Sequence, residues 1–173
     1  QHDSFRMLTE KGEQRARMRA ARIGHGFDIV MASPTTRTQR TAMLVGGKPK
    51  AQMCVLESLL TLPDPEGKKI LERMGQELGR ATFAEYMQHA NSETLLRFGK
   101  NAAREITETL MRKCLTYTDV LVVGHDVLTN VIISEMFPTG EVKELCLRHQ
   151  LSECGAIMIH VDGDGYTNSE VFD

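Results

Sequence analysis

The chain has 173 residues, of which 41% are hydrophobic and 25% are charged, and this length and composition suit one globular domain with a sizeable core. Acidic and basic residues nearly balance to a net charge of -2, so the overall charge does not favour a nucleic acid or an anionic membrane as partner. No apolar stretch approaches the roughly 18 residues of a membrane span, and no signal-peptide pattern opens the chain. We therefore expect a soluble cytoplasmic protein.

The cysteines do not indicate a metal site, because they form no C-x-x-C pair and no zinc-knuckle spacing. Reduced thiols in a cytoplasmic protein are the interpretation we favour, and a disulfide is the alternative. No other pattern points to a cofactor, so we expect neither metal nor cofactor. The four residues are Cys54, Cys114, Cys146 and Cys154.

The first part of the chain predicts a helix, a strand and a second helix. Residues 8–22 have the cap and composition of a helix, and the apolar run 27–32 reads as a buried strand. Ser33 is a good N-cap and Pro34 suits a first helical turn, so we expect a helix over 34–44.

The middle of the chain is mostly helical. After a short strand at 53–56, residues 63–113 favour helices that are broken near Gly79, Asn91 and Gly99. This stretch is longer than a crossover between parallel strands needs, so we expect part of it to form a cap-like insertion over the sheet edge.

The last part alternates strands and helices again. We expect a strand at 120–123, a helix at 128–136, and a strand at 156–161 that turns back toward 169–172. This order predicts an α/β domain with helices on both faces of a mostly parallel sheet, in a three-layer α/β/α arrangement. Residues 1–173 then form a single domain.

Two segments stand where a predicted strand ends and a helix begins. Residues 33–37 (SPTTR) follow the strand at 27–32, and residues 124–126 (GHD) follow the strand at 120–123. Strand ends in an open α/β sheet place their loops along one edge, where helix N-termini attract anions. The Arg37 guanidinium can fork onto two phosphate oxygens, and His125 can meet the same phosphate. The two segments therefore predict one shared anion pocket.

Three segments of the chain resemble motifs of the histidine phosphatase superfamily, whose fold is shared with phosphoglycerate mutases, and they occur in the same order as in the family. Residues 8–16 (LTEKGEQRA) are similar to the family's LTxxGxxQA, and residues 33–42 (SPTTRTQRTA) are similar to SPxxRxxxTA. Residues 122–126 (VVGHD) are similar to its VGH segment. Together they span most of the chain, so the resemblance is specific although each segment alone is weak.

The resemblance implies a metal-free mechanism in which a histidine attacks phosphorus and water then releases phosphate from the phosphohistidine. Arg37 would clamp the phosphoryl oxygens, His125 would stabilise their developing charge, and Gly124 would line the phosphate site. In the family the nucleophile belongs to an Arg-His-Gly motif at the end of the first strand, and this chain contains no such motif. We expect that strand to lie upstream of Gln1. The alternative is a non-catalytic relative that binds phosphate or acts as a scaffold.

Family members often add a carboxylic acid that protonates the leaving group. Glu57, which follows the short strand at 53–56, is the first candidate for this acid, and Asp64 and Glu66 are the next candidates. Arg40, which stands where many members have another residue, is expected on the helix surface.

The sequence thus predicts a phosphatase that hydrolyses a phosphate monoester or a phosphoramidate. Small-molecule and phosphoprotein substrates both stay open, as does the oligomeric state. The chain lacks the acidic ExxxGxxEG segment typical of glycolytic mutases, and it has neither G-x-x-x-x-G-K-[ST] nor G-x-G-x-x-G for a nucleotide. We interpret the basic residues of the first helix as a solvated face rather than a nucleic-acid stripe: Arg15, Arg17, Arg19 and Arg22.

Overall fold

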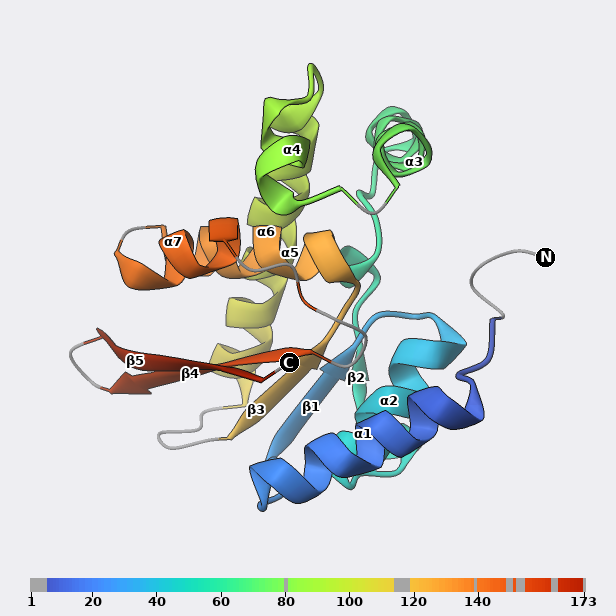
Figure 1. Cartoon of the computed structure of the whole chain (residues 1–173), viewed down its shortest axis with the longest axis vertical. Coiled ribbons are helices and arrows are strands. Elements are labelled where there is room, and N and C mark those ends of the chain that lie inside the picture. Colours follow the sequence, from blue (N-terminus) through green and yellow to red (C-terminus); the bar gives the residue numbers. More distant parts are fainter. Residues whose placement is uncertain are drawn as a thin grey trace.

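A computed structural model describes residues 6–79, 81–113, 119–138, 140–148, 151, 155–162 and 165–172. Figure 1 shows a sheet with helices on both of its faces. The chain therefore has the α/β class that its alternating pattern predicts. No helix within these ranges is long and apolar enough to cross a membrane.

Three parallel strands form the main sheet, in the order β2-β1-β3. They are β1 (Ile29–Ala32), β2 (Cys54–Val55) and β3 (Val120–Val123). Ala32 at the end of β1 pairs in register with Val55 and with Val123, the last residues of β2 and β3. Since all three strands end at the same level, the segments that follow them begin at one edge of the sheet.

Helices α1 (Glu10–Ile23) and α2 (Thr36–Gly46) cover one face of this sheet. Val30 and Ala32 of β1 pack there with Ala16 of α1 and Ala42 of α2. Helix α1 begins as its sequence predicts, because Thr9 is its N-cap and accepts a hydrogen bond from the Gly12 amide. At its other end Gly24 adopts a left-handed conformation, with φ of 76°, which glycine reaches without strain.

Helices α5 (Ser92–Arg112) and α6 (Asp126–Met136) cover the opposite face. Here Met31 of β1, whose side chain points the other way from those of its neighbours, packs in one cluster with Phe98 and Ile106 of α5 and Val131 of α6. Successive residues of β1 thus serve two separate cores. The three-layer α/β/α arrangement is confirmed.

The predicted helix break near Gly99 is wrong, because Gly99 lies inside α5. A Cβ atom at this position would come within 2.5 Å of the Val131 Cγ1 atom and 3.1 Å of its carbonyl oxygen. The glycine therefore permits α5 and α6 to pack closely rather than ending a helix. The predicted breaks near Gly79 and Asn91 are confirmed, since each lies between two helices.

Two shorter helices precede α5, and they are α3 (Pro65–Leu78) and α4 (Phe83–Gln88). Asp64 is the N-cap of α3, with Pro65 at its first position, and Thr82 forms a capping box with Glu85 at the start of α4. Figure 1 shows both helices at the top of the view, the direction in which β1 runs.

The remaining elements are short. Two 3₁₀ helices, η2 (Lys50–Gln52) and η3 (Glu57–Leu59), flank β2, and α7 (Glu141–Arg148) packs on α6. No helix was predicted at α7. Strands β4 (Ala156–Asp162) and β5 (Gly165–Phe172) pair antiparallel, as the predicted return of the chain requires. This pair forms a sheet separate from β1, β2 and β3 among the described residues.

Candidate active site

The candidate site lies at the edge where β1, β2 and β3 end. Ser33 follows β1 directly, Glu57 stands two residues after β2, and Gly124 and His125 follow β3. The backbone amide of Ser33 donates to the Val123 carbonyl oxygen at 3.1 Å, so the pairing of β1 with β3 continues to this level. The register of the sheet thus places both predicted motifs at one edge.

Helix α2 begins later than the sequence predicts. Its N-cap is Thr35, whose hydroxyl oxygen accepts from the Thr38 amide, and not Ser33; Pro34 precedes the helix. Ser33 cannot be the cap because its backbone still belongs to the β1–β3 ladder. Its side chain is consequently available for a contact across the site.

Arg37 and His125, which are 88 residues apart in the sequence, meet at this edge. The Arg37 Nη2 atom lies 3.4 Å from the His125 Nδ1 atom. The other ring nitrogen of His125, Nε2, lies 2.9 Å from the Ser33 hydroxyl oxygen. His125 is the N-cap residue of α6, so the helix starts beside it, two residues before the predicted start. The structure therefore brings together the two residues expected to bind a phosphate.

Ser33 and two threonines form a buried hydroxyl cluster behind His125. The Ser33 and Thr38 hydroxyl oxygens lie 2.7 Å apart, and those of Thr35 and Thr38 lie 2.9 Å apart. Sequence reasoning missed this cluster. Serine and threonine after a strand carry an N-cap signal, and that signal does not show which hydroxyl turns toward a histidine far along the chain.

Gly124 has a packing reason to be glycine. The amide and the hydroxyl of Thr129 donate to the His125 carbonyl oxygen at 2.9 Å and 3.2 Å. A Cβ atom on Gly124 would lie 2.8 Å from that Thr129 hydroxyl oxygen. The glycine thus leaves room for the contact that fixes the backbone of His125.

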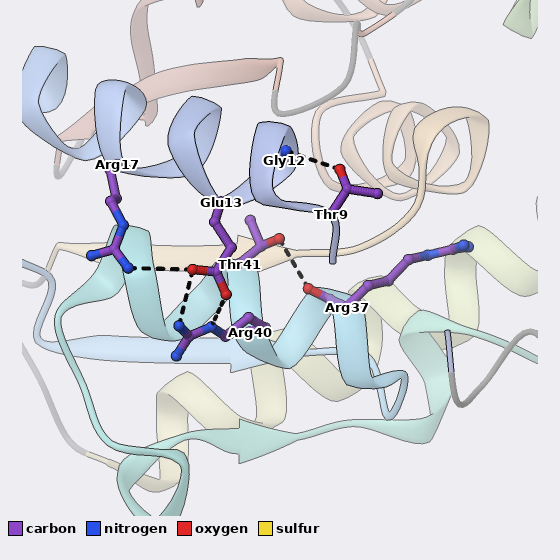
Figure 2. Close-up of polar contacts among 7 residues, drawn as sticks. All are labelled: Thr9, Gly12, Glu13, Arg17, Arg37, Arg40 and Thr41. Carbon is purple, nitrogen blue, oxygen red and sulfur yellow. Dashed lines mark hydrogen bonds and ion pairs between the residues drawn. The ribbon is translucent and has the colours of Figure 1, made fainter. Parts of the chain in front are cut away.

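Arg40 joins α2 to α1 rather than standing free on the surface. Its Nε and Nη2 atoms donate to the two carboxylate oxygens of Glu13 at 2.7 Å and 3.1 Å, and Arg17 approaches the same carboxylate at 3.3 Å. Figure 2 shows this cluster, with the Arg37 side chain extending away from it while the Thr41 hydroxyl donates to the Arg37 carbonyl oxygen. The hydrogen bond from Arg40 holds the pKa of Glu13 below its ordinary value.

The three candidate acids have different surroundings. Glu57 is exposed in η3, at the carboxyl end of β2. Asp64 accepts from the Gly67 amide at 2.7 Å and pairs with Arg97 at 3.2 Å, so its carboxylate stabilises the start of α3. Glu66 is exposed in the first turn of that helix.

Cys54 and Cys146 are free thiols, and burial raises the pKa of Cys146 to about 12. Cys114 and Cys154 lie outside the described residues. Within the ranges that the structure covers, no three His, Cys, Asp or Glu side chains are grouped so that they could hold a metal ion.

The fold is similar to those of several solved proteins, two of which are phosphatases. The phosphoserine phosphatase of Entamoeba histolytica, solved with 3-phosphoglyceric acid, is 16% identical with a TM-score of 0.63, over 96% of this chain and 83% of that one. The YhfR protein of Bacillus stearothermophilus is 20% identical with a TM-score of 0.61, and the alpha-ribazole phosphatase of Shigella flexneri is 18% identical with a TM-score of 0.59. Each of these two alignments covers 92% of this chain and 81% of the other.

A search of curated proteins found no match. The family model of the histidine phosphatase superfamily (branch 1), in contrast, matches residues 2–173, which is nearly the whole chain. The paired Arg37 and His125 lie in that matched range. The chain therefore belongs to the histidine phosphatase superfamily.

Proposed function

We propose that the protein is a phosphatase that hydrolyses a phosphate monoester or a phosphoramidate through a phosphohistidine intermediate, without a metal ion. The observation that carries the proposal is the contact between Arg37 and His125 at the sheet edge, where the Nη2 and Nδ1 atoms lie 3.4 Å apart. Two hydrogen-bonding groups this close together can both reach the oxygens of one phosphoryl group.

Arg37 and His125 have distinct roles in this mechanism. The Arg37 guanidinium donates two parallel hydrogen bonds to phosphoryl oxygens and fixes the orientation of the phosphorus atom. His125 donates to an oxygen whose negative charge grows in the transition state. Gly124, which precedes His125, lines the phosphate site with its backbone.

The nucleophile is a histidine of an Arg-His-Gly motif, on a strand that pairs with the outer edge of β3. The Asp119 carbonyl oxygen accepts from the amide of Ile29 in β1, and the Val123 carbonyl oxygen accepts from the amide of Ser33, which follows β1. Since backbone N–H and C=O groups alternate in direction along a strand, those of Val120 and Val122 point to the edge of β3 that faces away from β1. Among the described residues no strand pairs with that side, and β4 and β5 form a separate sheet. A parallel strand at this position would end level with Ser33 and His125, and would bring its histidine to the phosphate.

The cap that we expect over the site consists of α3 and α4, within residues 63–113. Contacts of α4 with α6 and α7 place it against the helix that starts beside His125. We propose that this cap selects the phosphorylated substrate, whether a small molecule or a phosphoprotein.

We also propose that the protein is cytoplasmic. The free thiols of Cys54 and Cys146 support this location.

The test measures turnover of an aryl phosphate by the protein with its native upstream residues. Arg37→Ala and His125→Ala should each lower kcat/KM about a hundredfold or more, because each removes a group that stabilises transition-state charge. Arg104→Ala and His25→Ala are the matched controls, since these side chains are 70% and 46% exposed on other elements, and they should leave turnover unchanged.

Unchanged turnover in either Arg37→Ala or His125→Ala would contradict the assignment. A non-catalytic relative gives a different result, because its wild-type chain binds inorganic phosphate in a calorimetric titration and still hydrolyses no ester. Mass spectrometry of the briefly reacted and alkali-quenched enzyme checks the intermediate, since the phosphohistidine adds one phosphoryl group to a peptide that contains the Arg-His-Gly motif.

A further inference from the structure

The hydroxyl cluster behind His125 is closed to water. Ser33, Thr35 and Thr38 are 0%, 1% and 4% exposed. Buried hydroxyl groups must satisfy one another or nearby backbone groups, because an unpaired one costs free energy. The direction of each hydrogen bond in the cluster can therefore be worked out from its geometry.

Thr38 fixes the direction of the first bonds. Its hydroxyl oxygen lies 3.0 Å from the carbonyl oxygens of Ser33 and Thr35, and a carbonyl oxygen only accepts. The single Thr38 proton is shared between these two carbonyls. Thr38 must then accept from the Ser33 hydroxyl at 2.7 Å, so the Ser33 proton points away from the histidine.

The histidine is held from both sides. Because the Ser33 proton is directed to Thr38, the Ser33 oxygen can only accept, and it accepts from His125 Nε2 at 2.9 Å. On the other side of the ring, Arg37 Nη2 faces Nδ1 at 3.4 Å, and a guanidinium has no acceptor. Nδ1 must therefore offer its lone pair. Both contacts select the neutral imidazole that carries its proton on Nε2.

We propose that Ser33, itself oriented by Thr38, is a positioning residue that keeps the proton of neutral His125 on Nε2 and turns the Nδ1 lone pair toward Arg37. The consequence for catalysis rests on the proposed function. A phosphate monoanion that binds to both Arg37 and His125 passes its proton to Nδ1, and the resulting imidazolium donates that proton back to a phosphoryl oxygen as a hydrogen bond. Nε2–H stays bound to Ser33 throughout, so the ring does not turn.

Two-bond ¹H–¹⁵N spectra of the imidazole rings test the tautomer in the full native chain without substrate, at a pH of about 9, where imidazoles are neutral. The His125 signals are those lost in His125→Gln. In the wild type we expect a protonated Nε2 and an unprotonated Nδ1. Ser33→Ala removes one hydrogen bond, which is worth about 1 kcal/mol, and should shift the tautomer ratio about fivefold toward Nδ1–H.

Thr38→Val and Thr38→Ser form a second, matched pair. Thr38→Val frees the Ser33 proton to point at Nε2 and should shift the ratio in the same direction, whereas Thr38→Ser keeps the hydroxyl and should restore the wild-type spectrum. Thr41→Val is the control, because this hydroxyl donates to the Arg37 carbonyl oxygen and lies outside the cluster. It should change nothing.

A wild-type His125 with its proton on Nδ1, or a ratio unchanged in both Ser33→Ala and Thr38→Val, overturns the proposal. If Ser33→Ala does not fold, the comparison of the two Thr38 variants decides. These spectra are recorded without any turnover. The tautomer proposal and the phosphatase proposal are therefore tested independently of each other. The expected tautomer in a protein that hydrolyses no phosphate would contradict the phosphatase and leave the role of Ser33 standing.

Discussion

At the scale of single residues, the site depends on side chains whose neighbours come from distant parts of the chain. The spacing of Arg37 after a strand predicts a place at the sheet edge, and the structure puts its Nη2 atom 3.4 Å from the Nδ1 atom of His125. Ser33 was recognised for the wrong reason, as a helix cap, and its hydroxyl contacts His125 instead. One residue can satisfy several local patterns, and only the fold shows which one applies.

Glu57 gives a prediction at this scale. If it protonates the leaving group, Glu57→Gln should lower kcat for an alkyl phosphate by about a hundredfold, because an alkoxide leaves poorly without a proton. The loss for a nitrophenyl phosphate should be much smaller, since that leaving group needs no proton. Steady-state kinetics with both substrates measures the difference.

Glu108→Gln is the matched control for Glu57→Gln, because Glu108 is an exposed glutamate of α5 that is not among the candidate acids. It should leave both substrates unaffected. An equal loss for the two substrates in Glu57→Gln would assign Glu57 to something other than proton transfer.

At the scale of helices, the segment LTEKGEQRA is best explained by the contact between α1 and α2. Thr9 caps α1, and Glu13 of the next turn receives two hydrogen bonds from Arg40 of α2. Arg37 lies one turn before Arg40 on α2. The ion pair thus holds in place the helix that presents Arg37 to the site.

Glu13→Gln should lower the Tm at neutral pH, because it removes the carboxylate that Arg40 binds. The pKa of Glu13 in the folded protein lies below its ordinary value of 4.5. The stabilisation is therefore present above that value and is lost as the pH falls through the folded-state pKa. Thermal unfolding of wild type and variant at several pH values should show the Tm difference shrinking in acid.

The matched control for Glu13→Gln is Glu108→Gln on α5, whose exposed carboxylate lies 3.9 Å from Arg104 and should contribute little. A Tm difference in Glu13→Gln that stays constant down to acid pH would show that the carboxylate charge is not what joins the two helices.

At the scale of the whole molecule, the main question is what lies beside β3. The strand is half-buried, pairs with β1 along one edge, and has no partner strand at the other within the described residues. Exposed edges of this kind invite pairing. The proposed upstream strand would pair with this edge of β3.

Hydrogen–deuterium exchange tests this strand. In the protein with its native upstream residues, the amides of Val120 and Val122 should exchange as slowly as those of Leu121 and Val123. In a chain that starts at Gln1 they should exchange faster, because their hydrogen-bond partners are gone. Leu121 and Val123 serve as internal references. Fast exchange of Val120 and Val122 in both chains would rule out a strand at this edge.

The sequence by itself determined the positions of most strands and helices and the α/β class, and it pointed to Arg37 and His125 as a pair that the fold brings together. These follow from local rules, since apolar periodicity, caps and spacing after a strand involve neighbours within about ten residues. Only the tertiary structure decided that Gly99 is a helix contact, that Arg40 binds Glu13, and that Ser33 contacts His125. Each of these depends on a partner that is at least 27 residues away in the sequence, and its place is set by the packing of helices on the sheet.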